Sequence, residues 1–237
     1  MWGREVEGVI LTFHLAGINN QNFLMRDEQT GTFWQQISGA AVSGPLKGRT
    51  LTLIPSDELS FALWKSEQAN GTLVRDVAAY TAEYAPEDWD VRMRRVPTVL
   101  SYAQPGLVPR TLVMGIRAFG TERAYPYDLL VAQKLTKDRL GGVPILIVLG
   151  PDGKSIRAFR AQIPASRYEA DIYRIEEGGL MMDSETGSRW NFQGCAVDGP
   201  AKGSCLDRIE IIKDYWFDWR HYNPGTSVFR IATRTSK

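Results

Sequence analysis

Two stretches of the chain, MRDEQTGTFWQQISGAAVSGPLKGRTL at 25–51 and MMDSETGSRWNFQGCAVDGPAKGSCL at 181–206, are variants of one pattern. Each contains D-x-x-T-G, a tryptophan three residues after that glycine, and then G-P-x-K-G. The copies lie about 155 residues apart, whereas solenoid and propeller repeats have periods of about 20–50 residues. The pattern therefore indicates duplication of a domain-sized unit.

Each copy has the chemistry of strands joined by tight turns. In D-x-x-T-G, the Asp and Thr side chains can bond nearby backbone groups while Gly takes a positive φ. In G-P-x-K-G, Pro presets φ and Gly reverses the chain. We therefore predict an α+β fold built from two small β-rich modules of short antiparallel strands, related by a pseudo-two-fold relation.

The chain divides into three parts on this pattern. We expect residues 1–72 to form the first copy, 73–110 a helical connection and linker, and 111–237 a second, more complete copy; the parts could pack as one domain. The start of the first copy could be natural or truncated.

Local signals predict the elements that follow each copy. Ser56 is the expected N-cap of a helix over 56–68, and Pro126 the expected start of a helix over 126–140. The stretches at 111–120 and 143–150 are predicted to be strands.

Charge and hydropathy limit the classes of partner. The 28 basic and 27 acidic residues nearly balance, so no nucleic-acid partner is expected. No apolar run approaches the roughly 20 residues of a membrane helix, and the chain as given has no signal-peptide pattern. The expected partner is a small molecule or a protein of unknown identity, and no cofactor can be named.

Two cysteines, Cys195 and Cys205, flank the turn DGPAKG. They could form a disulfide in an oxidising compartment or remain two reduced, buried thiols. Their spacing is not that of a metal site, and with only two histidines in the chain no metal is predicted. We expect an extracytoplasmic location, either periplasmic or secreted.

The second copy also carries a family resemblance. The segments DSETGSRWNFQGCAVDGPAKG, YWFDWRHYNPGTSVF, GIRAFGTERAYPYDLL and KDRLGGVPILIV resemble the bacterial and archaeal DUF3179 family. The resemblance covers about 110–230, and the first copy at 8–65 resembles the same signature. It implies a fold group but no activity.

This chain departs from that family at two places. Members commonly have a His-Glu pair in the helix after the AYP motif, where this chain has Gln133 and Lys134. They also commonly have Cys-Pro-x-Cys after the Gly-Gly-x-Pro strand, where this chain continues as Leu149, Gly150, Pro151 and Asp152. The metal or redox site that those residues resemble elsewhere is therefore not expected here.

Candidate catalytic residues are Asp218 and His221, three residues apart in DWRHYNPG. An Asp-His pair at helical spacing can fix a histidine tautomer for general base catalysis, and a polar rim on an aromatic helix is the alternative.

Candidate binding residues repeat in both copies or cluster in the second. Asp27 and Asp183 could act as a symmetric carboxylate pair, although the turn interpretation also explains their Thr and Gly neighbours. The aromatic candidates, which could equally be core, are Trp34, Trp190, Trp216 and Trp219.

Three functional hypotheses follow. The first is a non-enzymatic or chemically degenerate binding or structural module. The second is a hydrolase-like enzyme that uses Asp218, His221 and a turn carboxylate, and the third is a metal-binding protein. Whether the chain is an enzyme is left open by the sequence.

Overall fold

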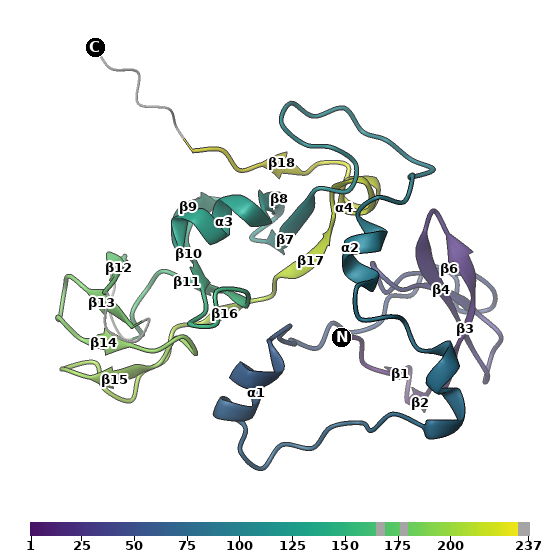
Figure 1. The fold of residues 1–237 in the computed structure, drawn as a ribbon, viewed down its shortest axis with the longest axis horizontal. Helices are drawn as coiled ribbons and strands as arrows, with labels where there is room; N and C mark the ends of the chain where they lie inside the picture. The colour runs from purple at the N-terminus through teal and green to yellow at the C-terminus, as the bar shows by residue number, and fades with distance from the viewer. Residues whose placement is uncertain (165–168, 176–179, 232–237) are drawn as a thin grey trace.

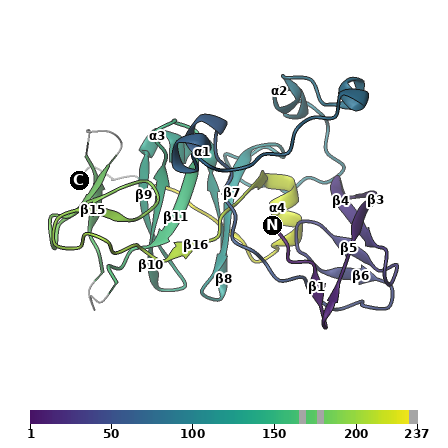
Figure 2. The same ribbon diagram turned by 90° about the horizontal axis from the view of Figure 1, so that it is seen from below.

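The structure of the protein, a computed structural model, describes residues 1–164, 169–175 and 180–231. Within these residues, four four-stranded sheets and a few short helices make up the fold (Figure 1). The α+β class predicted from the sequence is confirmed. Two small sheets lie at opposite ends of the molecule, with the two other sheets between them (Figure 2).

The first small sheet is antiparallel, in the order β3-β4-β5-β6. Its strands are β3 (Phe13–Asn19), β4 (Asn22–Asp27), β5 (Phe33–Gln35) and β6 (Ala41–Ser43), preceded by the hairpin of β1 (Glu5–Val6) and β2 (Val9–Ile10). Trp34 is the centre of its small apolar core. Because so few residues are buried around one tryptophan, strand pairing and turn chemistry contribute much of the local order.

The second small sheet repeats this order as β12-β13-β14-β15. Its strands are β12 (Ile172–Arg174), β13 (Met181–Asp183), β14 (Arg189–Trp190) and β15 (Ala196–Asp198). Both small sheets have a register shift at the tryptophan strand, between Phe33 and Trp34 and between Arg189 and Trp190. The duplication stays a prediction that this correspondence supports.

The two central sheets have the orders β17-β7-β8-β18 and β16-β11-β10-β9. The strands of the first are β7 (Leu112–Ala118), β8 (Thr121–Pro126), β17 (Ile212–Tyr215) and β18 (Ser227–Val228). The strands of the second are β9 (Leu135–Leu140), β10 (Val143–Leu149), β11 (Ile156–Arg160) and β16 (Arg208–Ile209). The strands predicted at 111–120 and 143–150 correspond to β7 and β10.

One apolar core joins the central sheets. Ile116 and Tyr125 from one sheet pack with Ile145 and Ile147 from the other, and each is almost completely buried. Burying a side chain of this size contributes about 1.5–3 kcal/mol. A second large core, with Leu146, Phe159 and Trp190, joins the sheet of β9, β10 and β11 to the second small sheet.

The helices are short: α1 (Phe61–Glu67), the 3-10 helix η1 (Ala78–Glu83), α2 (Trp89–Met93), α3 (Tyr127–Gln133) and α4 (Trp216–Tyr222). None of the helices in the described ranges is long and apolar enough to cross a membrane. Helix α4 follows β17 directly and packs against β7 (Figure 1).

Two helix predictions were wrong at their boundaries. Ser60, and not Ser56, caps α1, because Ser56 and Asp57 are held in extended chain by contacts with Glu210 and Arg157. The helix from Pro126 ends at Gln133, and 135–140 form strand β9 instead, because they pair with the apolar strand β10. In both cases tertiary contacts outweigh local helix propensity.

Candidate functional site

The turn after β4 is closed by Asp27. Its Oδ1 accepts a hydrogen bond from the Thr30 N–H (2.6 Å), and its Oδ2 accepts bonds from the Thr30 hydroxyl (3.0 Å) and the Trp34 indole N–H (2.8 Å). Burial alone would raise the pKa of Asp27, but the bonds from Trp34 and Thr30 outweigh it and hold the pKa below its ordinary value. Asp27 and Trp34 are completely buried.

The same contacts recur in the second copy. Asp183 accepts bonds from the Thr186 N–H (2.5 Å), the Thr186 hydroxyl (2.9 Å) and the Trp190 indole N–H (2.8 Å). Burial opposes ionisation of Asp183 as well, and the bonds from Trp190 and Thr186 again leave its pKa lowered. The structure thus places these predicted binding residues inside the small sheets, where each carboxylate ties its turn to its tryptophan.

The tryptophans of α4 lie in the core as well. Trp216 and Trp219 are almost fully buried with Val113 and Ala124. The ring of Trp219 lies so close to Gly115 that a Cβ there would approach it to 2.2 Å. These two predicted binding residues anchor α4 to β7.

The turn between β3 and β4, which we name the NNQN turn (Asn19–Asn22), docks onto Asp218 and His221 of α4. The Asn22 amide donates to Asp218 Oδ2 at 2.9 Å. The Asn20 amide nitrogen lies 3.0 Å from His221 Nε2, and the Tyr102 hydroxyl lies 2.7 Å from Nδ1. Because an amide nitrogen only donates, Nε2 is the acceptor and Nδ1–H donates to Tyr102. Both ring nitrogens of His221 therefore already have partners.

The NNQN turn and the elements that it contacts form a junction between the first copy and the rest of the chain, and Gln21 also makes contacts there. Gln21 donates to the Pro97 carbonyl (3.2 Å) and accepts from the Val99 N–H (2.9 Å). Asn20 and Gln21 have φ values of 50° and 67°, a conformation that non-glycine residues rarely adopt. The turn conformation thus directs consecutive amide side chains to two different parts of the chain.

A second carboxyl group, Asp214 at the end of β17, belongs to this network. Burial raises the pKa of Asp214 well above its ordinary value, and the charge of Asp218 raises it further. Burial also raises the pKa of Asp218, although the hydrogen bond from the Asn22 amide acts in the opposite direction. Asp214 Oδ2 and Asp218 Oδ1 are buried, and no described residue forms a hydrogen bond with either oxygen. Protonation of Asp214 would remove the repulsion between the two carboxylates.

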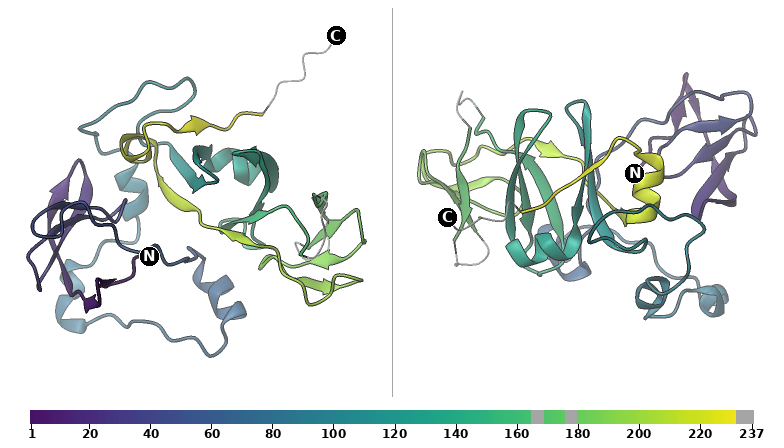
Figure 3. Two further views of the ribbon diagram at one scale, coloured as in Figure 1. Left: turned by 180° about the vertical axis from the view of Figure 1, so that it is seen from behind. Right: turned by 90° about the horizontal axis from the view of Figure 1, so that it is seen from above.

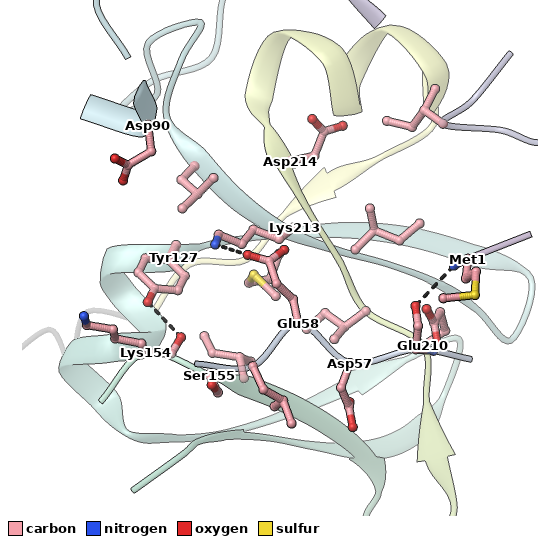
Figure 4. Close-up of a pocket in the computed structure, with 18 of the residues that line it drawn as sticks. Met1, Asp57, Glu58, Asp90, Tyr127, Lys154, Ser155, Glu210, Lys213 and Asp214 are labelled. Atoms are coloured by element: carbon pink, nitrogen blue, oxygen red, sulfur yellow. Dashed lines mark hydrogen bonds and ion pairs between the residues drawn. The ribbon is translucent and has the colours of Figure 1, made fainter. Parts of the chain in front are cut away.

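Beside this network lies a cleft of about 650 Å³. One wall comes from the first copy, with Asn22, Ile37 and residues 56–60, and the other from the central sheet, with Leu112 and residues 210–214. Figure 4 shows Glu58, Tyr127, Lys213 and Asp214 around this space. A volume of this size is within the range of about 300–1,000 Å³ that is typical of small-molecule sites.

An ion-pair cluster fixes the wall that the first copy supplies. The guanidinium of Arg157 lies 2.7 Å from both Asp57 and Glu67, and Arg208 forms a second ion pair with Asp57. Burial would raise the pKa of Asp57, but the bonds from Arg208 and Arg157 lower it to about 2. Lys213 of β17 pairs with Glu58 across the cleft (Figure 4). These pairs hold residues 56–60 at a set position next to the central sheets.

The cleft combines an apolar surface with charged groups. Apolar lining residues include Leu59, Leu112, Met114, Ile156 and Ile211. Arg94 and Lys154, both exposed, contribute positive charge at its edge, and Asp90 contributes negative charge. Such a surface suits a ligand with an apolar body and polar ends.

Cys195 and Cys205 form a disulfide and are not two reduced thiols, the other state that the sequence left open. They pair as an isolated antiparallel bridge, and Ala40 and Thr50 form the equivalent bridge in the first copy without a disulfide. The covalent bond is therefore an addition to a geometry that the turn already produces. Among the described residues, no group of three or more His, Cys, Asp or Glu side chains is placed to hold a metal ion.

Two features of this site were not predicted from the sequence. One is the NNQN turn, whose signal was four consecutive amide side chains between two strands. The other is Asp214, whose signal was a second carboxylate four residues before Asp218. The contact of the NNQN turn could not be read from the sequence, because Asn22 and Asp218 lie 196 positions apart. The burial of Asp214 depends on tertiary packing, which the spacing to Asp218 does not reveal.

Comparison with family models matches residues 1–226 of the 237 to the family described as "Protein of unknown function (DUF3179)". Comparison with curated proteins and with solved structures found no match.

Proposed function

Since the chain belongs to the DUF3179 family, whose description assigns no activity, we propose from the site itself that the protein is a non-catalytic binding module. Its ligand is a small molecule with an apolar body and polar ends, held in the cleft between the first copy and the central sheets.

The observation that carries this proposal is the cleft and its construction. Its two walls come from distant parts of the chain, and the ion pairs of Arg157 with Asp57 and Glu67 fix residues 56–60 against the central sheets. A cavity kept open in this way is prepared for a ligand, because little side-chain or loop ordering is left to oppose binding.

The hydrogen bonds of the predicted catalytic residues support a module in which His221 does not act as an acid or a base. A general base needs a free nitrogen within reach of substrate, whereas both nitrogens of His221 bond to Asn20 and Tyr102. The carboxylates of Asp27 and Asp183 serve their own turns. These groups support the structure of the junction and the small sheets.

We also propose that the module works outside the cytoplasm, in the periplasm or as a secreted protein. The disulfide between Cys195 and Cys205 supports this location, because such bonds persist in oxidising compartments and are uncommon in the cytosol.

The test is native mass spectrometry of the full chain purified from its own host, with retained small molecules released and identified. Charge reversal at the cleft edge, in Lys154→Glu and Arg94→Glu, is expected to lower retention of the ligand. Lys47→Glu, an exposed lysine of the first small sheet, is the matched control and should retain it. A wild-type chain that carries no small molecule, and whose melting temperature does not respond to a metabolite library, would contradict the proposal.

A hydrolase is the second candidate, and one observation favours it. Asp214 lines the cleft and has a raised pKa, so it could supply a proton to a bound substrate. The assay is turnover of 4-nitrophenyl esters and glycosides by the wild type and by Asp214→Asn. Turnover that disappears in Asp214→Asn would favour the enzyme, whereas no turnover by either protein is what the binding module predicts.

A further inference from the structure

Residues 73–99, which we name the arm, connect the first copy to the central sheets. The arm leaves α1, forms η1 and α2, and stands away from the sheets in Figure 2 and in the right-hand view of Figure 3. Neither η1 nor α2 buries a single residue. Within the described part of the chain, most of the arm is therefore left without a surface that covers it.

The arm is nevertheless apolar in composition. Nine of its large apolar side chains are between 40% and 97% exposed: Leu73, Val74, Val77, Tyr80, Tyr84, Trp89, Val91, Val96 and Val99. Solvated linkers have few such residues, because low hydrophobicity is what keeps a segment from packing. An arm of this composition is typical of a segment that is covered by another surface.

A second uncovered apolar surface lies on the β3–β4 hairpin, and we name it the hairpin face. Leu15 lies opposite Met25, and Ile18 lies opposite Phe23 in the strand register. Residues two apart on a strand point to one side, so Phe23 shares a face with Met25, which packs partly buried against the core around Trp34. The hairpin face is the uncovered continuation of that side, with Leu15, Ile18 and Phe23. Leu15, Ile18 and Phe23 are each more than half exposed, and β3 is the edge strand of its sheet.

The combined area of the two surfaces matches what a stable dimer needs. A fully exposed aliphatic side chain presents about 60–120 Å² and an aromatic one about 150–250 Å². On that scale the arm and the hairpin face together expose roughly 850 Å² of apolar side chain. A standard protein interface buries about 800 Å² from each partner, whereas the largest apolar patch of a typical monomer is about 300–600 Å².

The charge of the arm distinguishes between a lipid bilayer and a second protein chain as the surface that covers it. It carries four basic and five acidic side chains, a net charge of −1: Arg75, Arg92, Arg94 and Arg95 against Asp76, Glu83, Glu87, Asp88 and Asp90. An anionic bilayer attracts segments with a basic excess, which the arm does not have. The mixture of both signs suits a surface that must meet itself, because a symmetric dimer brings the same residues to both sides of the interface.

We propose that the arm and the hairpin face are the dimer interface of this protein, with a second copy of the chain as the occupant. In the dimer each chain contributes its arm and its hairpin face, and the partner chain covers both surfaces. The proposal is independent of the ligand in the cleft. The dimer would still affect the cleft in one way. Asp90 and Arg94 of the arm line the cleft, and the dimer would fix the position of both residues.

The test is sedimentation velocity of the full chain over about 1–100 μM, the range in which interfaces of this size associate when they are weak. The expected result is a species of twice the 26.6 kDa chain mass at high concentration. Leu73→Asp with Val74→Asp in the arm, and Ile18→Asp on the hairpin face, should each weaken the dimer at least tenfold. Because these side chains are exposed, circular dichroism and the melting temperature of the variants should stay at the wild-type values.

Val197→Asp on β15 is the matched control, since it places the same charge at an exposed valine of the other small sheet. It should leave the dimer unchanged. A wild type that stays monomeric at every concentration overturns the proposal, as does a dimer that the arm and hairpin variants leave intact. A monomer that floats with phosphatidylcholine and phosphatidylglycerol vesicles would assign the arm to a bilayer, and it overturns the proposal as well.

Discussion

Replacing Asp214 by Asn should stabilise the protein at neutral pH. The pKa of Asp214 is raised above its ordinary value of 3.8 by burial and by Asp218, so the folded state binds a proton that the unfolded state releases. Stability from such a group is complete below the ordinary pKa and is lost as the pH rises through the folded-state pKa. Asparagine keeps the shape of the protonated acid and has no proton to lose.

The size of this effect follows from proton linkage. For one proton retained by the folded state, the free energy of unfolding falls by about 1.4 kcal/mol for each pH unit between the two pKa values. The wild type should lose stability with that slope, whereas Asp214→Asn should lose less. The difference between the two proteins should therefore grow with pH and level off above the folded-state pKa of Asp214.

Urea unfolding at several pH values between about 5 and 8 measures this difference directly. Asp76→Asn, at an exposed aspartate of the arm, is the control and should follow the wild type at every pH. Parallel curves for the wild type and Asp214→Asn would show that Asp214 is ionised in the folded protein, which would refute its raised pKa.

Three further predictions test the junction, the core and the disulfide. Asn22→Ala removes the amide donor of Asp218 and should cost about 1–3 kcal/mol of unfolding free energy, measured by urea unfolding. Gly115→Ala pushes a methyl group into the ring of Trp219 and should cost about 1–3 kcal/mol, seen as a lower melting temperature with altered near-UV circular dichroism. Replacing Cys195 and Cys205 by serine should lower stability by about 3 kcal/mol, because the bond closes a loop with a sequence separation of 10; a reduced wild type should match this variant.

Sequence patterns located the turns better than the helices. D-x-x-T-G predicts its own structure because Asp27 reaches its backbone partner three residues away. The start of α1 was misplaced by contrast, since the extended form of Ser56 and Asp57 depends on Glu210 and Arg157, which are distant in the chain. Turn chemistry is local, and helix boundaries yield to tertiary contacts.

Asp218 and His221 show the same limit for function. Their spacing indicated an acid-base pair, and the structure does bring both into one polar network. The role of that network depends on Asn20 and Asn22, which arrive from the first copy and occupy the groups that catalysis would use. Residue type and spacing identified the reactive groups but not their partners.

Local rules were enough for the α+β class, the strands at 111–120 and 143–150, and the repeated turns, because each depends on residues within a few positions of one another. The cleft, the NNQN turn docked on α4 and the burial of Asp214 beside Asp218 were decided only when the chain folded. The cleft and the docked NNQN turn each join segments that lie from about 100 to about 200 residues apart. Pairings over such separations depend on how the central sheets pack, and periodicity and spacing within a single stretch carry no information about them.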